Sequence, residues 1–347
     1  MKRVDNWLLT AVQMGLLAWS GASLAADKVY VANEGADTVS VLDAASFKTL
    51  ASVRVGKMPH NVQVSPDGKL VWVTNNGEPG QAVDASAHKE MAQGAHGAME
   101  KPGAVWAIDT ATNAIVAKVP VGMHPAHVVV SPDGRLAYVA NGGDNTVSVI
   151  DTAAQRPVAT IPVGQFPHGL RISPDGTQVY VANLKGGTVS VIDTASQKEV
   201  AQVPAGKGPA QVGFTPDGRL AFVSLSEENA VAVIDPATRK VTRKIPVGSV
   251  PIQLYATPDS RTLLVANQGS PKKPGKTVSM IDLESFKVVK SLMTGAGAHG
   301  VVVDRDGRYA YVTNSYANSV SVLDVKDRKV VKTVTVDKGP NGISVTP

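Results

Sequence analysis

Histidine is the residue of this chain whose distribution most clearly predicts chemistry. Four of the seven histidines fall in one short window that returns at regular intervals along the chain. Imidazoles are common metal ligands and also titrate near neutral pH, so converging histidines predict a site for a metal ion or an anionic ligand. The aligned copies of the window are Pro59-His60-Asn61, Pro125-Ala126-His127, Pro167-His168-Gly169, Pro209-Ala210-Gln211, Pro251-Ile252-Gln253, Ala298-His299-Gly300 and Pro340-Asn341-Gly342.

The sequence leaves two interpretations of this window open. If equivalent positions converge on one axis, the candidate metal ligands are His60, His127, His168 and His299, with Gln211, Gln253 and Asn341 as ligand-binding residues that complete the ring. Alternatively, each imidazole bonds only to a neighbouring loop. His127 stands one residue out of register with the other three, so it could point elsewhere.

A second group of possible ligands lies in an insertion over residues 76–103. There His88-x-x-Met91 recurs as His96-x-x-Met99, and residues three apart share one face of a helix. Imidazole and thioether ligands together suit copper, particularly Cu(I), so these four residues are candidate ligands in a lid over the ring of histidines. The alternative is an alanine-rich surface loop whose methionines serve apolar packing.

The elements that must position these residues are repeated strands. An aspartate follows a Val/Ile-rich strand signal seven times, with spacings of 66, 42, 42, 42, 47 and 42 residues. Each copy carries four strand signals. A Pro-Asp-Gly turn separates the first two in four copies, as at residues 174–176, and weaker copies of this turn occupy residues 257–260 and 304–307. Repeats of about 40 residues with four strands each are typical of propeller blades.

The two ends of the chain predict how such a ring closes. Beyond residue 25 the chain starts on a second-strand signal, at residues 29–33, and it finishes on a first-strand signal, at residues 342–346. We therefore predict an all-β fold, a seven-bladed β-propeller of four-stranded blades. It closes by pairing of the C-terminal strand with the N-terminal blade, and residues 26–347 form a single domain.

The repeats resemble the YVTN family of seven-bladed propellers. The tetrapeptide that names the family stands at residues 311–314, and near-copies occupy residues 30–33, 72–75, 138–141 and 180–183. The resemblance spans the whole predicted domain and implies the fold. The family includes surface-layer proteins, periplasmic binding proteins, metallochaperone-like proteins and subunits linked to redox enzymes, so it implies no single function. Leu225 replaces the family's asparagine in one copy, which predicts a turn that is capped differently.

The first residues predict export. Lys2 and Arg3 precede an apolar run at residues 7–19, and small residues follow around Ala25. This pattern predicts a signal peptide over residues 1–25 and a periplasmic or secreted protein. The apolar run is too short to cross a bilayer, although a membrane anchor is the alternative. The chain has no cysteine, which excludes disulfides and haem attachment through cysteine.

Three classes of function remain. The net charge is +5 with dispersed basic residues, which argues against a nucleic-acid partner, and the glycine-rich residues 295–300 precede no helix signal, so no nucleotide is expected. The first hypothesis is a periplasmic, monomeric binding protein that holds copper, zinc or a small ligand at the histidine-lined mouth of the channel. The second is a metal-assisted lyase, lactonase or oxidoreductase component that uses the same mouth. The third is a scaffold that docks another exported protein through residues 76–103.

Overall fold

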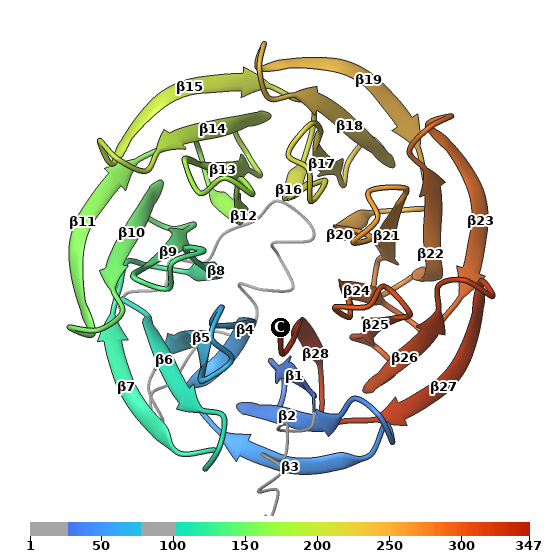
Figure 1. Ribbon diagram of the computed structural model, residues 1–347, viewed down its shortest axis with the longest axis horizontal. Coiled ribbons are helices and arrows are strands. Elements are labelled where there is room, and N and C mark those ends of the chain that lie inside the picture. Colours follow the sequence, from blue (N-terminus) through green and yellow to red (C-terminus); the bar gives the residue numbers. More distant parts are fainter. Residues whose placement is uncertain (1–26, 78–101) are drawn as a thin grey trace, which may run out of the picture.

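Seven four-stranded antiparallel sheets stand in a ring around a central channel (Figure 1). The computed structural model describes residues 27–77 and 102–347, and all regular elements in these residues are strands. The predicted all-β, seven-bladed propeller is therefore confirmed. The described residues contain no helix with the length and hydrophobicity needed to cross a bilayer.

The blades follow one another along the chain, and each runs from an inner strand at the channel to an outer strand at the rim. Blade 1 consists of β28 (Pro340–Val345), β1 (Lys28–Asn33), β2 (Thr38–Asp43) and β3 (Thr49–Arg54). Blade 2 consists of β4 (Lys57–Val64), β5 (Leu70–Gly77), β6 (Ala104–Asp109) and β7 (Ile115–Pro120). Blade 3 consists of β8 (Pro125–Val130), β9 (Leu136–Asn141), β10 (Thr146–Asp151) and β11 (Arg156–Pro162).

The remaining blades repeat the same order. Blade 4 consists of β12 (Pro167–Ile172), β13 (Gln178–Asn183), β14 (Thr188–Asp193) and β15 (Lys198–Pro204). Blade 5 consists of β16 (Pro209–Phe214), β17 (Ala221–Leu225), β18 (Ala230–Asp235) and β19 (Lys240–Pro246). Blade 6 consists of β20 (Pro251–Ala256), β21 (Thr262–Gly269), β22 (Pro274–Asp282) and β23 (Lys287–Met293). Blade 7 consists of β24 (Ala298–Val303), β25 (Tyr309–Asn314), β26 (Ser319–Asp324) and β27 (Lys329–Thr335).

Strand β28 closes the ring, as the two ends of the sequence predict. It pairs antiparallel with β1, and Val31 lies opposite Ile343. Each of the seven hydrophobic clusters lies between two neighbouring blades, so no blade has a core of its own. The cluster shared by blades 7 and 1 contains Tyr311 and Val29. Because every blade buries both faces against its neighbours, the ring holds the inner strands in fixed positions.

The asparagine at the end of the second strand bonds to two hydroxyl groups of the third strand. Asn183 donates from Nδ2 to Thr188 Oγ1 at 2.9 Å and to Ser190 Oγ at 2.8 Å, and blades 1, 3, 6 and 7 contain the same arrangement. In blade 5, Leu225 takes the place of the asparagine and Ala230, which lies opposite it, takes the place of the first hydroxyl residue. Apolar side chains therefore replace both the donor and this acceptor. The sequence deviation at Leu225 is thus matched by a change in its partner strand.

The difference between blades 4 and 5 predicts that Asn183 and its two hydroxyl partners, Thr188 and Ser190, contribute jointly to the free energy of unfolding. Asn183→Leu alone is expected to destabilise the fold by about 1–3 kcal/mol, because it removes the Nδ2 donor shared by the hydroxyl groups of Thr188 and the buried Ser190. Adding Thr188→Ala and Ser190→Ala, which copies blade 5, should restore part of that loss, since Ser190 Oγ also accepts a bond from Gly164 N. Urea unfolding of the single and triple variants measures the coupling, and equal destabilisation in both would contradict it.

A β-bulge at the start of every inner strand shapes the channel mouth. In blade 4, Pro167 pairs with Asn183 and Leu170 pairs with Val181, so two inner-strand residues oppose one residue of β13. The same shift occurs in all seven blades. The bulged residues are the histidine-containing window of the sequence. Because a bulge redirects side chains, two adjacent positions of the inner strand can both face the channel.

A second-strand hydroxyl supports this bulge and joins neighbouring blades. Thr313, the threonine of the YVTN tetrapeptide, accepts a hydrogen bond from Gly300 N and donates one to Asn341 O, both at 2.7 Å. Thr74 and Ser224 make the equivalent pair of bonds in blades 2 and 5. The repeat motif therefore stabilises the backbone that carries the candidate site.

Candidate metal centre

Three of the histidines meet in the channel. His60 on β4, His127 on β8 and His168 on β12 come from consecutive blades, and one ring nitrogen of each lies within 4.8 Å of those of the other two. All three side chains are buried, with at most 7% of their surface exposed. Among the described residues this is the group whose geometry could hold a metal ion.

The three rings are close but differ in how they approach one another. His60 Nε2 and His168 Nε2 lie 3.2 Å apart. The ring of His127 is 5.1 Å from that of His168 and 5.6 Å from that of His60, measured between centroids. His127 occupies the second bulge position whereas the others occupy the first, and the bulge lets both positions reach the channel.

The backbone of blade 5 fixes the tautomer of His168. Its Nδ1 lies 2.9 Å from Ala210 O, and a carbonyl oxygen can only accept a hydrogen bond. In the neutral ring the proton is therefore on Nδ1, and Nε2 is an acceptor that faces His60. Metal-ligating histidines commonly carry this kind of bond from the nitrogen that does not bind the metal.

His60 takes the complementary state through Asn341 and Glu34. Because His168 Nε2 accepts, His60 Nε2 donates to it, and His60 Nδ1 accepts from Asn341 Nδ2 at 3.1 Å. Asn341 Nδ2 also donates to Glu34 Oε2 at 2.6 Å, and Glu34 Oε1 lies 3.9 Å from His60 Nδ1. Glu34, just after β1, is a carboxylate at this site that the sequence analysis missed.

Gln211 contacts the third histidine. Its Oε1 accepts from Val212 N at 3.1 Å, which directs Nε2 toward His127 Nδ1 at 3.5 Å. A Cβ atom on Gly169 would collide with Gln211 Oε1, so the glycine in blade 4 makes room for the amide of blade 5. His127 Nε2 has no hydrogen-bond partner among the described residues although it is buried.

The other predicted ring members lie in the same layer but outside the three-histidine group. The ring of His299 is 6.3 Å from that of His60, and Gln253 is buried, with no partner for its Nε2 among the described residues. Burial, followed by the neighbouring His60 and His168, lowers the pKa of His299 to about 3. Burial also lowers the pKa of His127 well below its usual value. Both imidazoles are therefore neutral, the state that binds a metal ion.

A small pocket adjoins the three histidines. It has a volume of only about 10 Å³, and His60 and His168 form part of its wall together with His124, Phe166 and Asn76. His124, which precedes the histidine window, has a positive φ of 50° and lies 6.4 Å from the Phe166 ring. A space of this size holds about one water molecule beside the imidazoles that could bind a metal ion.

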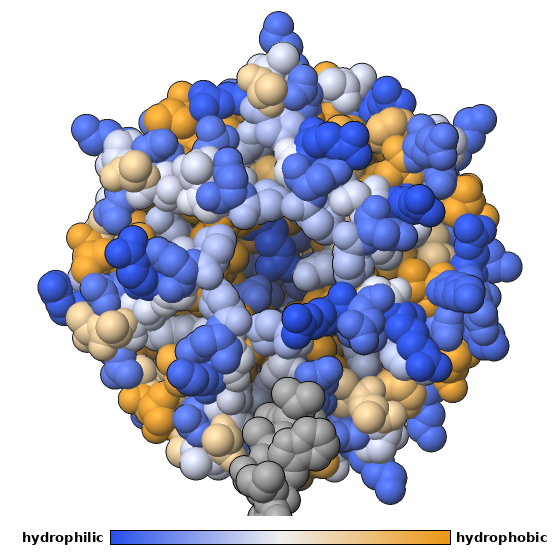
Figure 2. All heavy atoms as spheres, in the orientation of Figure 1, coloured by the Kyte–Doolittle hydropathy of each residue, from blue (hydrophilic) through white to orange (hydrophobic). Residues whose placement is uncertain are grey.

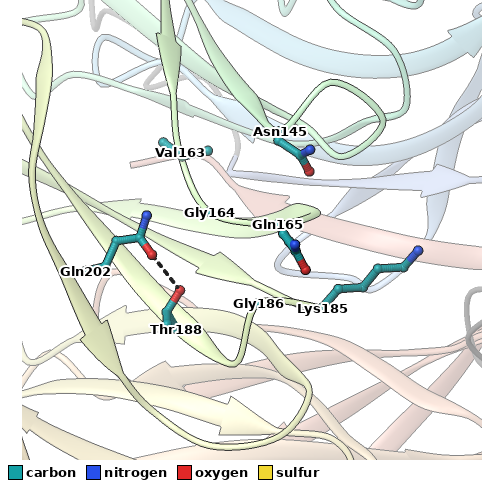
Figure 3. A pocket seen from close by; sticks show the side chains of 8 residues that line it. All are labelled: Asn145, Val163, Gly164, Gln165, Lys185, Gly186, Thr188 and Gln202. Carbon is teal, nitrogen blue, oxygen red and sulfur yellow. Dashed lines mark hydrogen bonds between the residues drawn. The ribbon is translucent and has the colours of Figure 1, made fainter.

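A larger, polar hollow lies between blades 3 and 4 (Figure 3). Gln165, Lys185 and Thr188 line it, and the Thr188 hydroxyl lies 3.4 Å from Gln202 Oε1. Lys185 Nζ is 5.2 Å from the centroid of the Phe166 ring, and burial lowers the pKa of this lysine. Phe166 itself lines the histidine pocket, and no carboxylate lines the hollow among the described residues.

The candidate lid ligands His88, Met91, His96 and Met99 lie outside the described residues. The described residues that flank the insertion do adjoin the candidate site. Gly77 pairs with Lys57 at the start of β4, and a Cβ atom on Gly103 would collide with Pro125 at the start of β8. The insertion therefore leaves and rejoins the ring beside the strands that carry His60 and His127.

Two family models match parts of the chain. A choice-of-anchor I domain model matches residues 83–243, and a YNCE-like beta-propeller model matches residues 271–346. Antigen Lp49 of Leptospira interrogans is 27% identical over 123 residues, which are 35% of this chain and 25% of that protein. The chain thus matches a quarter of the length of that relative.

Solved structures share the whole ring. A functionally unknown protein from Desulfotomaculum acetoxidans superposes with a TM-score of 0.74 at 17% identity, covering 92% of this chain and 98% of the other. The periplasmic gluconolactonase PpgL of Pseudomonas aeruginosa superposes with a TM-score of 0.71 at 19% identity, covering 92% and 99%. At these identities the similarity shows the fold and leaves the chemistry to the site itself.

Proposed function

We propose that this seven-bladed β-propeller of the YVTN type is an exported metal-binding protein that holds zinc or copper through His60, His127 and His168. The observation that carries the proposal is the convergence of three buried imidazoles from three blades in the channel. Three imidazoles form a donor set suited to zinc and copper.

The distances support this assignment. Tetrahedral ligands at about 2.0–2.1 Å from an ion have nitrogen atoms about 3.3 Å apart. His60 Nε2 and His168 Nε2 already lie 3.2 Å apart, while the largest separation in the group is within 4.8 Å. Movement of one ring, that of His127, would complete a three-ligand site. Its buried Nε2 has no partner among the described residues, so this movement would cost no hydrogen bond at that atom.

The proton positions also suit a metal ion. His168 carries its proton on Nδ1 and can bind through Nε2 without a change of tautomer. His60 would shift its proton from Nε2 to Nδ1. Asn341 Nδ2, which donates to Nδ1 at 3.1 Å, would then have to turn away so that Glu34 Oε1, 3.9 Å from Nδ1, could approach as the acceptor. A carboxylate in this place holds the ring orientation and makes the imidazole a better ligand.

Metal content tests the proposal directly. We expect protein purified from the compartment to which it is exported to bind one Zn²⁺ or Cu²⁺ ion per chain. Elemental analysis and competition with a chromophoric chelator measure this content. The double variant His60→Ala and His168→Ala should bind none at the same chelator concentration. Metal content well below one per chain in the intact protein, unchanged in the double variant, would contradict the proposal.

One observation favours a metal-assisted enzyme as the second candidate. The site has three protein ligands, and three ligands with an open position are typical of catalytic rather than structural zinc. The pocket of about 10 Å³ beside His60 and His168 gives that position room for about one water molecule, the nucleophile that a catalytic zinc ion activates. Hydrolysis of a panel of lactones and esters, with and without Zn²⁺, separates the two functions, because a pure binding protein shows no metal-dependent turnover.

A further inference from the structure

A guanidinium group lies one layer away from the histidines in the same channel. Arg171 stands three residues after His168 on β12, and Gln63 stands three residues after His60 on β4. Arg171 Nη1 donates to Gln63 Oε1 at 3.1 Å, just as the two histidines above them meet at 3.2 Å. Blades 2 and 4, which are not neighbours in the ring, therefore meet twice inside the channel.

The charge of Arg171 has no counterion among the described residues. No described carboxylate lies within 4.0 Å of its guanidinium, whose hydrogen-bond acceptor is the neutral amide of Gln63. The guanidinium carbon lies 5.8 Å from the Tyr255 ring centroid, and burial lowers the pKa of the group. At the position equivalent to Arg171, the other six inner strands carry no acidic residue that could pair with it. These residues are Gln63, Val129, Gly213, Tyr255, Val302 and Ser344.

An unpaired charge in this position needs an explanation. Water solvates a partly buried cation only in part, so a charge without a partner is unfavourable there, whereas a bound anion would supply the missing charge. The face drawn in Figure 2 is hollowed at its centre, and hydrophilic side chains lie in the hollow. Arg171 itself is only partly buried, so an anion can reach it.

We propose that Arg171 makes the channel a binding site for a small oxyanion, the carboxylate or phosphate group of a small molecule. The planar guanidinium has five N–H donors, and its bond to Gln63 uses one of them, which leaves the paired donors that bind two oxygen atoms of one group. Gln63 holds the guanidinium in place across the channel. The inference does not depend on a bound metal ion, because it concerns a different layer of the channel.

The alternative is a structural arginine that only ties blades 2 and 4 together through Gln63 and Tyr255. Anion titration of the full exported chain, treated with EDTA and kept at constant ionic strength with sodium chloride, separates the two roles. Sodium acetate and inorganic phosphate are the probes, and isothermal titration calorimetry is the readout. We expect one saturable site, and the better of the two probes identifies the class of oxyanion.

Three variants make the test specific. Arg171→Gln should lower the affinity for the more tightly bound anion by about 10- to 100-fold, which is the loss expected when charge-assisted hydrogen bonds are removed. Gln63→Leu keeps the cation but removes the bond that holds it in place, so it should lower the affinity by less than Arg171→Gln does, and it tests the site even if Arg171→Gln folds poorly. Arg243→Gln is the matched control, since that arginine also lies over an aromatic ring, Phe286, but on the outer strand β19.

The outcomes are decisive. Saturable binding that Arg171→Gln weakens and Arg243→Gln leaves unchanged supports the oxyanion site. The inference is overturned if neither acetate nor phosphate binds the intact protein saturably, or if Arg171→Gln binds as tightly as the intact protein. A Zn²⁺ or Cu²⁺ titration of the same EDTA-treated sample tests the metal site separately, so failure of one leaves the other standing.

Discussion

Replacing His168 with alanine is expected to lower the affinity of the chain for Zn²⁺ by more than about 100-fold. Loss of a residue that only supports a metal ligand typically costs 10–100-fold, and removal of the ligand itself should cost more. His168 is central to the group, because its Nε2 lies 3.2 Å from that of His60 and its ring is 5.1 Å from that of His127. Its Nδ1 bond to Ala210 O also makes it the ligand with the most firmly set orientation.

Two other histidines provide the controls for this experiment. His299 lies in the same layer but outside the group of three, so His299→Gln should change Zn²⁺ affinity by less than about tenfold. His124 lines the adjoining pocket with a positive φ of 50°, which asparagine tolerates, so His124→Asn should preserve the metal site. Competition titrations measure all three variants. Equal losses in all of them would show that the group of three does not form the site.

Mild acid is expected to destabilise the metal-free protein, and His299 is the group for which the size of the effect can be given. Its pKa is about 3 in the fold, whereas a histidine in the unfolded chain titrates near 6.5. Between these two pH values the unfolded chain binds more protons than the folded chain, so the free energy of unfolding falls as the pH falls. At pH 5, which is 1.5 units below 6.5, the loss is about 2 kcal/mol, at about 1.4 kcal/mol per unit.

His127 adds to this acid sensitivity in the same direction, because burial holds its pKa well below the usual value. Urea unfolding of EDTA-treated protein at several pH values between 8 and 5 measures the slope. The variant His299→Gln cannot gain a proton at this position. Its free energy of unfolding should therefore fall by about 2 kcal/mol less than that of the intact protein over this pH range. Identical slopes for the two proteins would mean that His299 does not carry the effect.

The metal site and the acid sensitivity have one physical origin. The ring closes on itself through β28 and β1, and each blade is buried on both faces by its neighbours. The first residues of each inner strand are therefore withdrawn from water while they face one another. Burial lowers the pKa of His127 and His299 there, so both imidazoles stay neutral and are poor proton acceptors. Among the proposed ligands, His127 would be protected from protonation by a bound ion, which would reduce part of the acid sensitivity.

The oxyanion site adds a second function to the channel. Imidazoles line one layer and Arg171 the next, both carried by β12 at a spacing of three residues. A ligand that carries an oxyanion could therefore bind to the guanidinium on the strand that also carries His168.

The sequence alone determined the number of blades, their four-strand pattern and the way the ring closes. These features depend on local signals that repeat, such as the Pro-Asp-Gly turns, the alternating strands and the split first blade. It also identified the window that faces the channel, because equivalent positions of a closed ring must face the same axis. The seven hydrophobic clusters between blades are the physical consequence of that repetition.

Only the tertiary structure decided which members of the window meet. The sequence placed His127 in the same window as His60 and His168 but one residue out of register, which left its direction open. The β-bulge on each inner strand presents two adjacent positions to the channel, so His127 joins the other two. Glu34 and Arg171 carry no repeated signal, because each stands at a position where the other copies differ. Their contacts with His60 and Gln63 join residues far apart in the chain. Such contacts follow from the closure of the ring and the size of single side chains, which no local pattern records.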